Sequence, residues 1–404
     1  MKNILASYPI LQTGESQSTY QWVILALIWL SYCVFGLISR SLAPLVTPIV
    51  RDLGISYSQM GIIMGAWPMT YILVSLFGGI ILDRWGAHKS LFIGICIIGL
   101  SSTLRYFAGG FGTMFIFVAL FGMGGPIISI GAPKTISLWF KGRSRGTAVG
   151  IYTTAPWVGA LVAFSMTNSV FMPLTDNNWR MALVIYGGFA FAAALLWLIL
   201  AKDITSPGSV TDAGVFEVFK KLIRVSNVRI IILIGFMHFI IIHGFINWLP
   251  GLLEDSGLSP TIAGFASSIP TLVSIPTVLI LPRLLAPHQR GWALALGSLA
   301  LGIALMTVSL TFKGYLIFGL VFLGVSSSYI MPLLMLIMME TRGVEARYMG
   351  AAGGIFFCVS EIGGFVGPLI VGTLVDMTGS FILGMLFLAC LGGVLSVLSL
   401  KLKS

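Results

Sequence analysis

Twelve apolar segments, separated by short polar turns, constrain this chain more than any other feature of its sequence. They fall at 21–48, 57–82, 90–108, 112–139, 146–172, 180–201, 229–253, 259–283, 291–311, 314–338, 349–373 and 379–400. A helix needs about 20 predominantly apolar residues to cross the hydrocarbon core of a bilayer, and each segment is near or above that length. We therefore predict an all-α membrane protein with twelve transmembrane helices.

The composition excludes most other classes of protein. Charged residues make up 9% of the chain, whereas a soluble domain carries about 25%. A membrane β-barrel is also excluded, because its strands alternate in polarity and contain no long apolar runs. The sequence contains no nucleotide-binding loop, metal-protease motif or nucleophile constellation, and its four cysteines lie singly inside apolar segments. We therefore do not expect an enzyme, a metal site or a cofactor.

The basic residues are distributed unevenly, and this predicts how the helices are oriented. The formal net charge is +10, but helical membrane proteins keep excess Lys and Arg on cytoplasmic loops, so nucleic-acid binding is not indicated. If the N-terminus is cytoplasmic, 17 of the 23 Lys and Arg residues lie on the cytoplasmic side, 3 lie outside and 3 lie within the segments. We expect a multi-pass protein of the cell (inner) membrane with both termini in the cytoplasm.

The interval 202–228 is the one long polar stretch between apolar segments. It contains a Ser-Pro-Gly turn signal and ends in a short basic segment. We predict that it is a cytoplasmic linker between an N-terminal six-helix bundle, residues 1–201, and a C-terminal six-helix bundle, residues 229–404. We expect the chain to work as a monomer in the lipid bilayer.

The turn after the second apolar segment carries the most informative motif. Residues 79–89 read Gly-Ile-Ile-Leu-Asp-Arg-Trp-Gly-Ala-His-Lys. This resembles the signature loop of the major facilitator superfamily, in which Gly, three residues, Asp, a basic residue, any residue and Gly precede further basic residues. The resemblance implies that Asp83 and Arg84 gate the cytoplasmic side; alternatively, the basic residues only follow the charge rule for cytoplasmic turns. Ala87 departs from the pattern, since many members carry a basic residue there.

The resemblance extends over the whole chain. Glycine-proline patterns at 150–159 and 363–368 are similar to helix-packing motifs at corresponding positions of family members. The resemblance implies two pseudo-symmetric six-helix bundles that rock about a site near the membrane midplane, so that the site opens alternately to each side. The arginine that many members carry early in the fourth helix is missing near Val118 and Ala119, so the mechanism of drug–proton antiporters is not carried over.

Two regions are similar to particular branches of the superfamily. Residues 35–44, followed by 51–56, look like the anion:cation symporter and cyanate-permease-like branches, and residues 247–259 read similarly to the latter. Organic-anion symporters of the former branch often carry an arginine in the seventh helix where this chain has His238. The resemblance implies a small anion as the substrate.

Arg40 and Glu361 are ionisable residues that fall inside predicted helices. A charge at the bilayer centre costs about 2.5–3.5 kcal/mol, so each one needs a reason. Arg40 can hold a carboxylate through two hydrogen bonds and keeps its charge throughout a transport cycle; alternatively, it is a structural partner of Glu361 or of a backbone carbonyl. Burial favours the neutral form of Glu361, which can then carry a proton in one state and release it in another. A fixed ion pair of Glu361 with Arg40, His238 or His243 is the alternative.

Two histidines lie near the middle of the seventh apolar segment. A spacing of five residues turns His238 and His243 in different directions on a helix, so only one is expected to face a central cavity. His238 is a candidate substrate ligand and His243 a candidate for proton coupling; packing without function is the alternative for both. Lys134, near the inner end of the fourth segment, is a candidate substrate contact that can instead reach the interface. Arg105, near the outer end of the third segment, is expected to extend to the membrane surface.

Polar and aromatic side chains within the segments complete the predicted substrate site. They are Tyr71, Tyr152, Trp157, Asn247 and Tyr329. These residues offer hydrogen bonds and flat apolar walls, which binding cavities for small solutes use. For each of them, packing in the core or against lipid is the alternative.

The sequence therefore predicts a secondary active transporter that moves a small organic or inorganic anion by alternating access. Moving one negative charge inward against 100 mV costs about 2.3 kcal/mol, so accumulation requires proton-coupled symport or exchange against another anion. Two other functions stay open, namely an efflux carrier of a neutral or hydrophobic compound and a transporter-like membrane receptor. The expected partners are the anion, protons and the lipid bilayer.

Overall fold

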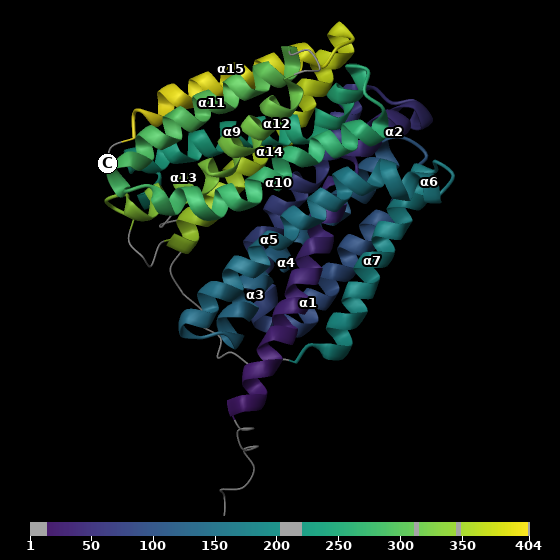
Figure 1. The fold of residues 1–404 in the computed structure, drawn as a ribbon. Helices are drawn as coiled ribbons and strands as arrows, with labels where there is room; N and C mark the ends of the chain where they lie inside the picture. Colours follow the sequence, from purple (N-terminus) through teal and green to yellow (C-terminus); the bar gives the residue numbers. More distant parts are fainter. Residues whose placement is uncertain (1–13, 203–219, 311–314, 345–348, 403–404) are drawn as a thin grey trace, which may run out of the picture.

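Helices make up nearly all of the described chain (Figure 1). The computed structural model describes residues 14–202, 220–310, 315–344 and 349–402, and within these ranges it contains helices and turns without a strand. The helices are α1 (Gly14–Arg40), α2 (Val46–Leu53), α3 (Tyr57–Leu104), α4 (Phe111–Trp139), α5 (Gly142–Met166), α6 (Met172–Leu174), α7 (Trp179–Leu200), α9 (Ser226–Asp255), α10 (Pro260–Leu284), α11 (Arg290–Leu310), α12 (Leu316–Ser328), α13 (Ile330–Glu340), α14 (Met349–Thr378) and α15 (Ile382–Ser399). The all-α prediction is confirmed.

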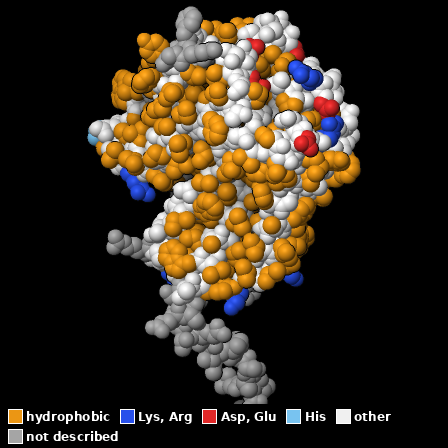
Figure 2. Space-filling model, turned by 45° about the vertical axis from the view of Figure 1, so that its right-hand side comes forward, with side chains coloured by type: hydrophobic (Ala, Val, Ile, Leu, Met, Phe, Trp, Pro, Cys, Tyr) orange, Lys and Arg blue, Asp and Glu red, His pale blue; other side chains and the backbone are white. Residues whose placement is uncertain are grey.

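The helices match the predicted membrane spans. Eleven helical segments of the described chain are long and apolar enough to cross a membrane. One of them, Thr19–Leu53, joins α1 and α2 through a 3₁₀ turn, and another, Leu316–Glu340, joins α12 and α13. The predicted span 57–82 is the first part of α3. Figure 2 shows apolar side chains over the flanks of the molecule, with the charged side chains gathered toward its edges, as a protein surrounded by lipid requires.

Helix α3 contains two of the predicted spans because the chain reverses at Gly86. This residue has φ 79° and ψ 161°, inside an element of 48 residues that is otherwise helical. Backbone of this kind is open to glycine and strained for other residues. The hydroxyl of Ser90, after the reversal, is 3.5 Å from the carbonyl oxygen of Ile81 before it. The second glycine of the signature-like loop therefore makes the turn between two spans.

Small residues let α1 and α5 approach each other closely. A Cβ atom at Gly36 would clash with the backbone of Pro156, and one at Gly159 would clash with the backbone of Cys33. Gly159 belongs to the glycine-proline pattern of the fifth predicted span, and its bare backbone replaces a side-chain layer between the helices. This contact holds the end of α1, and with it Arg40, against α5.

The helices form two groups along the chain. Helices α1 to α7 pack mainly on one another, as do α9 to α15, and the groups meet where α3 lies against α14 and α5 lies against α10. Figure 1 shows the two groups converging at the end of the molecule that holds α2 and α6, which we call the α2–α6 end. The groups separate toward the opposite end, where α1 begins and α15 finishes, which we call the terminal end. Most of the predicted linker 202–228 lies outside the described residues, so the domain boundaries stay a prediction.

Hydrogen bonds join the two groups at the α2–α6 end. The Asp376 carboxylate on α14 accepts hydrogen bonds from the backbone amides of Tyr57 (2.9 Å) and Ser58 (2.8 Å) at the start of α3. The Thr47 hydroxyl on α2 donates to the Glu254 carboxylate on α9 at 2.8 Å. The helix N-terminus gives the Asp376 contact a favourable charge interaction as well. This end of the molecule is therefore closed by contacts between the groups.

Candidate functional site

A set of buried polar atoms without hydrogen-bond partners gathers where the two helix groups meet. The atoms are Nη1 of Arg40, Nδ1 of His238, Nδ1 of His243, Nδ2 of Asn247 and Oε2 of Glu361. Arg40 is the last residue of α1, Glu361 lies on α14, and the other three lie on α9. Buried polar groups are nearly always hydrogen-bonded. A concentration of exceptions in one region indicates a place that is built to meet a polar ligand.

Arg40 and Glu361 are close enough for their charges to interact, yet they do not form an ion pair. The charge of each acts on the other, but no described carboxylate oxygen lies within 4.0 Å of the Arg40 guanidinium. The predicted alternative of a fixed contact between these two residues is therefore absent from this conformation. Each group keeps a buried atom available for another partner.

His243 and Glu361 face the same small space beside Gly364. A Cβ atom at position 364 would lie 2.9 Å from Oε2 of Glu361 and 3.3 Å from Nδ1 of His243. The His243 ring stacks on Phe239, with ring centroids 5.6 Å apart, and lies 5.6 Å from the ring of Trp67. The Glu361 carboxylate and the His243 imidazole therefore both pack against Gly364.

His238 is buried one and a half turns before His243 on the same helix. Its side chain is 3% exposed, its Nδ1 has no partner, and its ring meets Phe239 edge-on at 6.3 Å. The contacts with Trp67 and with the space beside Gly364 belong to His243. The structure therefore brings His243, rather than His238, next to Glu361.

Two of the predicted aromatic residues belong to a wall that runs from α1 to α5. Tyr71 lies 6.0 Å from Trp67 between ring centroids, and its hydroxyl shares a 2.6 Å hydrogen bond with Ser129. Tyr152 lies 6.1 Å from Tyr32, which we did not select from the sequence. The signal for Tyr32 was its position two turns before Arg40 on the same helix.

Other predicted residues lie away from this cluster. Tyr329, between α12 and α13, is directed toward α11, where its hydroxyl is 3.5 Å from the carbonyl oxygen of Ala293. Trp157 is half-buried on α5 beside Pro156, and Lys134 is half-buried on α4 toward the terminal end. Arg84 is exposed, and the side chain of Asp83 lies outside the described part of the structure, so their gating role stays a prediction.

Arg105 is not at the membrane surface, and the expectation that it extends there is wrong. Its side chain is 2% exposed. Nη1 donates to the Ser41 hydroxyl and Nη2 to the Ser101 hydroxyl, both at 3.2 Å. The chain tightens into a 3₁₀ turn at Arg105–Phe107, which directs the guanidinium inward to the end of α1. Ser101, one helical turn earlier on the same face, was the sequence signal for an internal partner.

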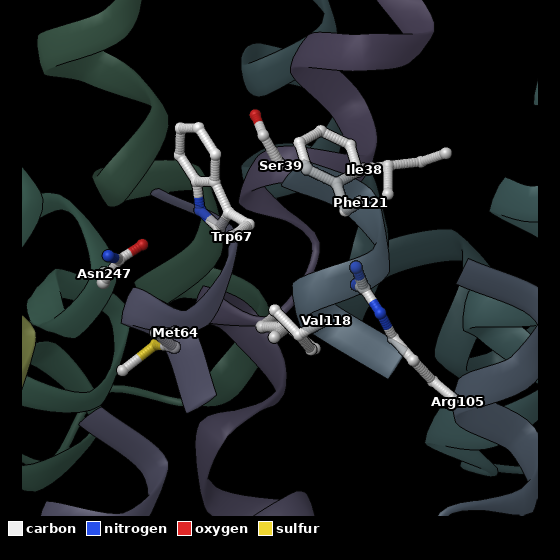
Figure 3. Close-up of a pocket in the computed structure, with 9 residues that line it drawn as sticks. Ile38, Ser39, Met64, Trp67, Arg105, Val118, Phe121 and Asn247 are labelled. Atoms are coloured by element: carbon white, nitrogen blue, oxygen red, sulfur yellow. The ribbon is translucent and has the colours of Figure 1, made fainter. Parts of the chain in front are cut away.

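Arg105 lines a narrow pocket between the two helix groups (Figure 3). Ser39, Met64, Trp67 and Phe121 contribute to its walls from the first group, and Asn247 contributes from α9. Figure 3 shows the guanidinium reaching in from one side, with Asn247 on the other side beyond Val118 and Trp67.

Comparisons with known proteins agree with this architecture. A family model described as Major Facilitator Superfamily matches residues 28–368. The chain is 23% identical over 390 residues to the hexuronate transporter of Bacillus subtilis (strain 168), covering 86% of both chains. It is 25% identical over 380 residues to the probable galactarate/D-glucarate transporter GudP of Escherichia coli (strain K12), covering 82% of both. It is 23% identical over 406 residues to the probable sulfoacetate transporter SauU of Cupriavidus necator, covering 94% of this chain and 93% of that one.

Solved structures share the fold at low sequence identity. A bacterial homolog to the human lysosomal transporter Spinster, in an inward-facing and occupied conformation, has a TM-score of 0.77 and 15% identity, covering 94% of this chain and 96% of that one. The nucleoside transporter NupG has a TM-score of 0.80 and 15% identity, covering 95% of this chain and 100% of that one. These likenesses establish the fold, with two groups of membrane helices.

Proposed function

The chain belongs to the major facilitator superfamily and is a membrane transporter, and we propose that it carries a small organic anion across the bilayer by alternating access. The observation that best supports this proposal concerns Nη1 of Arg40. This atom is buried and has no hydrogen-bond partner in the described protein, although Glu361 is near. The three relatives described above, named for hexuronate, galactarate/D-glucarate and sulfoacetate, support an organic anion as the cargo.

Arg40 would bind the acidic group of the cargo. A guanidinium matches a carboxylate with two parallel hydrogen bonds, and it cannot lose its charge during the cycle. The neighbouring tyrosines, Tyr71 and Tyr152, offer hydroxyls and ring faces to the rest of a hydroxylated solute. His238, buried with Nδ1 unpartnered, would assist from the other helix group.

Glu361 and His243 would couple transport to protons. A buried carboxylate can stay ionised while a nearby positive charge is uncompensated, and can accept a proton once a bound anion cancels that charge. Arg40 supplies that positive charge, and an anion bound to its guanidinium would weaken the interaction with Glu361. The same groups therefore link occupancy of the site to protonation. Symport with protons overcomes the cost of about 2.3 kcal/mol per negative charge per 100 mV.

The contacts at the α2–α6 end would form one of the two gates. The excess of basic residues would place the terminal end in the cytoplasm, and the α2–α6 end would then face outward. The hydrogen bonds from Asp376 and Glu254 across the two groups then belong to an external gate that is closed in this conformation. Asp83 and Arg84 would contribute to the opposite gate. Working as a monomer, the two groups would rock about Arg40 and Glu361.

Uptake by purified protein in liposomes tests the proposal. We expect Arg40→Gln to raise KM for D-glucarate, D-glucuronate or sulfoacetate about 10- to 100-fold, because a charge-assisted hydrogen-bonded pair contributes about 1.5–3 kcal/mol. Arg51→Gln, a change of an exposed arginine on α2, is the matched control and should leave KM unchanged.

The same assay separates the two competing functions. An efflux carrier of a neutral compound would transport its cargo equally well with glutamine at position 40. A receptor would bind labelled anion without counterflow, that is, without exchanging it against unlabelled anion across the membrane. Either result would remove the proposed function.

A further inference from the structure

Arg105 is a second buried cation, and no described carboxylate compensates it. No carboxylate oxygen of a described residue lies within 4.0 Å of its guanidinium, and its Nε has no hydrogen-bond partner. Burying a charge without a counter-charge is costly, and the cost falls when an ion of opposite sign is bound. The hydroxyls of Ser41 and Ser101 satisfy only two of the five N–H groups.

Those two serines fix the direction of the guanidinium. Ser41 donates its own proton to the carbonyl oxygen of Ile38 at 2.8 Å, and Ser101 donates to that of Phe117 at 2.6 Å. Both hydroxyls therefore present lone pairs to Arg105 and act as acceptors. Nε is left without a hydrogen-bond partner, and a carboxylate can bind the Nε edge of a guanidinium in a planar, two-bond geometry.

The opposite helix group supplies a second donor to the same pocket. Asn247 on α9 is 4% exposed, lines the pocket, and its Nδ2 has no hydrogen-bond partner. The residues that line the pocket thus include two buried N–H groups without an acceptor, and one of these residues, Arg105, is positively charged. Apart from Ser39, its other lining residues, including Met64, Trp67 and Phe121, are apolar or aromatic. This combination favours an anionic group over a neutral or cationic one.

Trp67 connects this pocket to the site of Arg40. One contact of its ring is with His243, at 5.6 Å between centroids, and the same side chain lines the Arg105 pocket. Along the chain, Arg40 lies between Ser39, which lines the pocket, and Ser41, which binds Arg105. Arg40 and the Arg105 pocket therefore both lie at the end of α1.

We propose that the pocket of Arg105 and Asn247 binds a second acidic group of the cargo, so that the preferred substrate carries two negative charges. The inference rests on the proposed function, in which Arg40 binds the first acidic group. In this conformation the pocket has about 10 Å³ of free space, room for one water molecule, so an acidic group would enter it only when the two helix groups move apart. Because Arg105 belongs to the first helix group and Asn247 to the second, binding of this group also draws the two together.

Pairs of anions that differ in one acidic group provide the test. D-Glucarate against D-gluconate, galactarate against D-galactonate, and sulfoacetate against methanesulfonate are measured by equilibrium binding to the full-length protein in detergent. We expect at least one dianion to bind about tenfold more tightly than its monoanion, as one charge-assisted contact provides. Arg105→Gln and, separately, Asn247→Leu should reduce this ratio to within about twofold, whereas Arg51→Gln should keep it.

The variants separate a binding role from a structural one. Asn247→Leu removes no hydrogen bond made by Nδ2, and a Tm equal to that of the wild type would show that a lost preference in that variant does not come from misfolding. Arg40→Gln should weaken both members of a pair, which distinguishes failure of the proposed function from failure of this inference. A wild-type protein without preference for any dianion, or a preference that survives both Arg105→Gln and Asn247→Leu, overturns the proposal. Chloride that competes equally with both members of a pair also overturns it, because the pocket would then hold a separate small anion.

Discussion

Glu361 on α14 and His243 on α9 meet at Gly364, where together they leave no room for a Cβ atom. Oε2 of Glu361 and Nδ1 of His243 lie 2.9 and 3.3 Å from the position that a Cβ atom at residue 364 would take. Neither atom has a hydrogen-bond partner. Each atom is therefore available to a ligand or a proton, which a carboxylate that exchanges protons requires.

Gly364→Ala should therefore impair transport more than folding. The added methyl group meets the flexible end of Glu361 at 2.9 Å, so the carboxylate has to move away from His243. We expect KM for the anion to rise about three- to tenfold, the equivalent of roughly 1 kcal/mol, in liposome uptake assays. Gly353→Ala, on the same helix with open space around it, is the control; equal effects of the two changes would contradict the assignment.

Glu361→Gln should separate coupling from binding. Glutamine keeps the size of the side chain, but its amide does not lose or gain a proton at physiological pH. We expect uptake driven by an imposed proton gradient to fall to the background level, while counterflow of labelled anion persists. If gradient-driven accumulation survives in this variant, Glu361 does not carry the coupling proton.

Asp376→Asn should open the α2–α6 end. The carboxylate accepts two hydrogen bonds from backbone amides at the start of α3, and the neutral amide oxygen replaces it poorly because charge-assisted bonds are stronger. Spin labels at the exposed residues Leu174 and Met377, in a variant whose four native cysteines are replaced by serine, report the separation of the two helix groups. We expect the distribution of label distances to shift to longer values. Asp255 is an exposed acidic residue at the same end, and Asp255→Asn should leave the distribution of label distances unchanged.

Gly86→Ala should destabilise the protein. The residue has φ 79° and ψ 161°, a conformation that costs a residue with a Cβ atom about 1–3 kcal/mol. A lower Tm in detergent, with less folded protein recovered from membranes, is the expected result. Gly150→Ala, in α5 with open space around its Cβ position, should have little effect. An unchanged Tm for Gly86→Ala would show that the turn does not depend on this backbone conformation.

Most of the fold follows from the sequence because hydrophobic length determines a membrane helix. Each predicted apolar segment coincides with a helix, and the glycine of the signature-like loop accounts for the reversal inside α3. The bends are less predictable. The turn at Ala43–Leu45 in the first span and the break at Ser328–Ile330 in the tenth depend on local packing, which the count of apolar residues does not reveal.

The site is less predictable because the direction of a side chain depends on the helix that faces it. Burial of Arg40, His243, Asn247 and Glu361 could be expected from their place inside apolar segments. The inward turn of Arg105 could not, since the same position near a helix end allows a long side chain to extend outward. The contact of Glu361 and His243 at Gly364 could not be predicted either, because it depends on how α9 packs against α14. From the sequence alone, a glycine in a helix is usually explained by close contact between helices.

The contact between Asp376 and the start of α3 has a consequence for how this protein tolerates sequence change. Both donors are peptide groups of Tyr57 and Ser58, so their availability does not depend on which side chains stand at those two positions, proline excepted. These two hydrogen bonds therefore survive a change of side chain at either position, although the Tyr57 ring also packs on Trp248 and Phe381 of the other helix group. Asp376 has no replacement that accepts both bonds with a negative charge except glutamate.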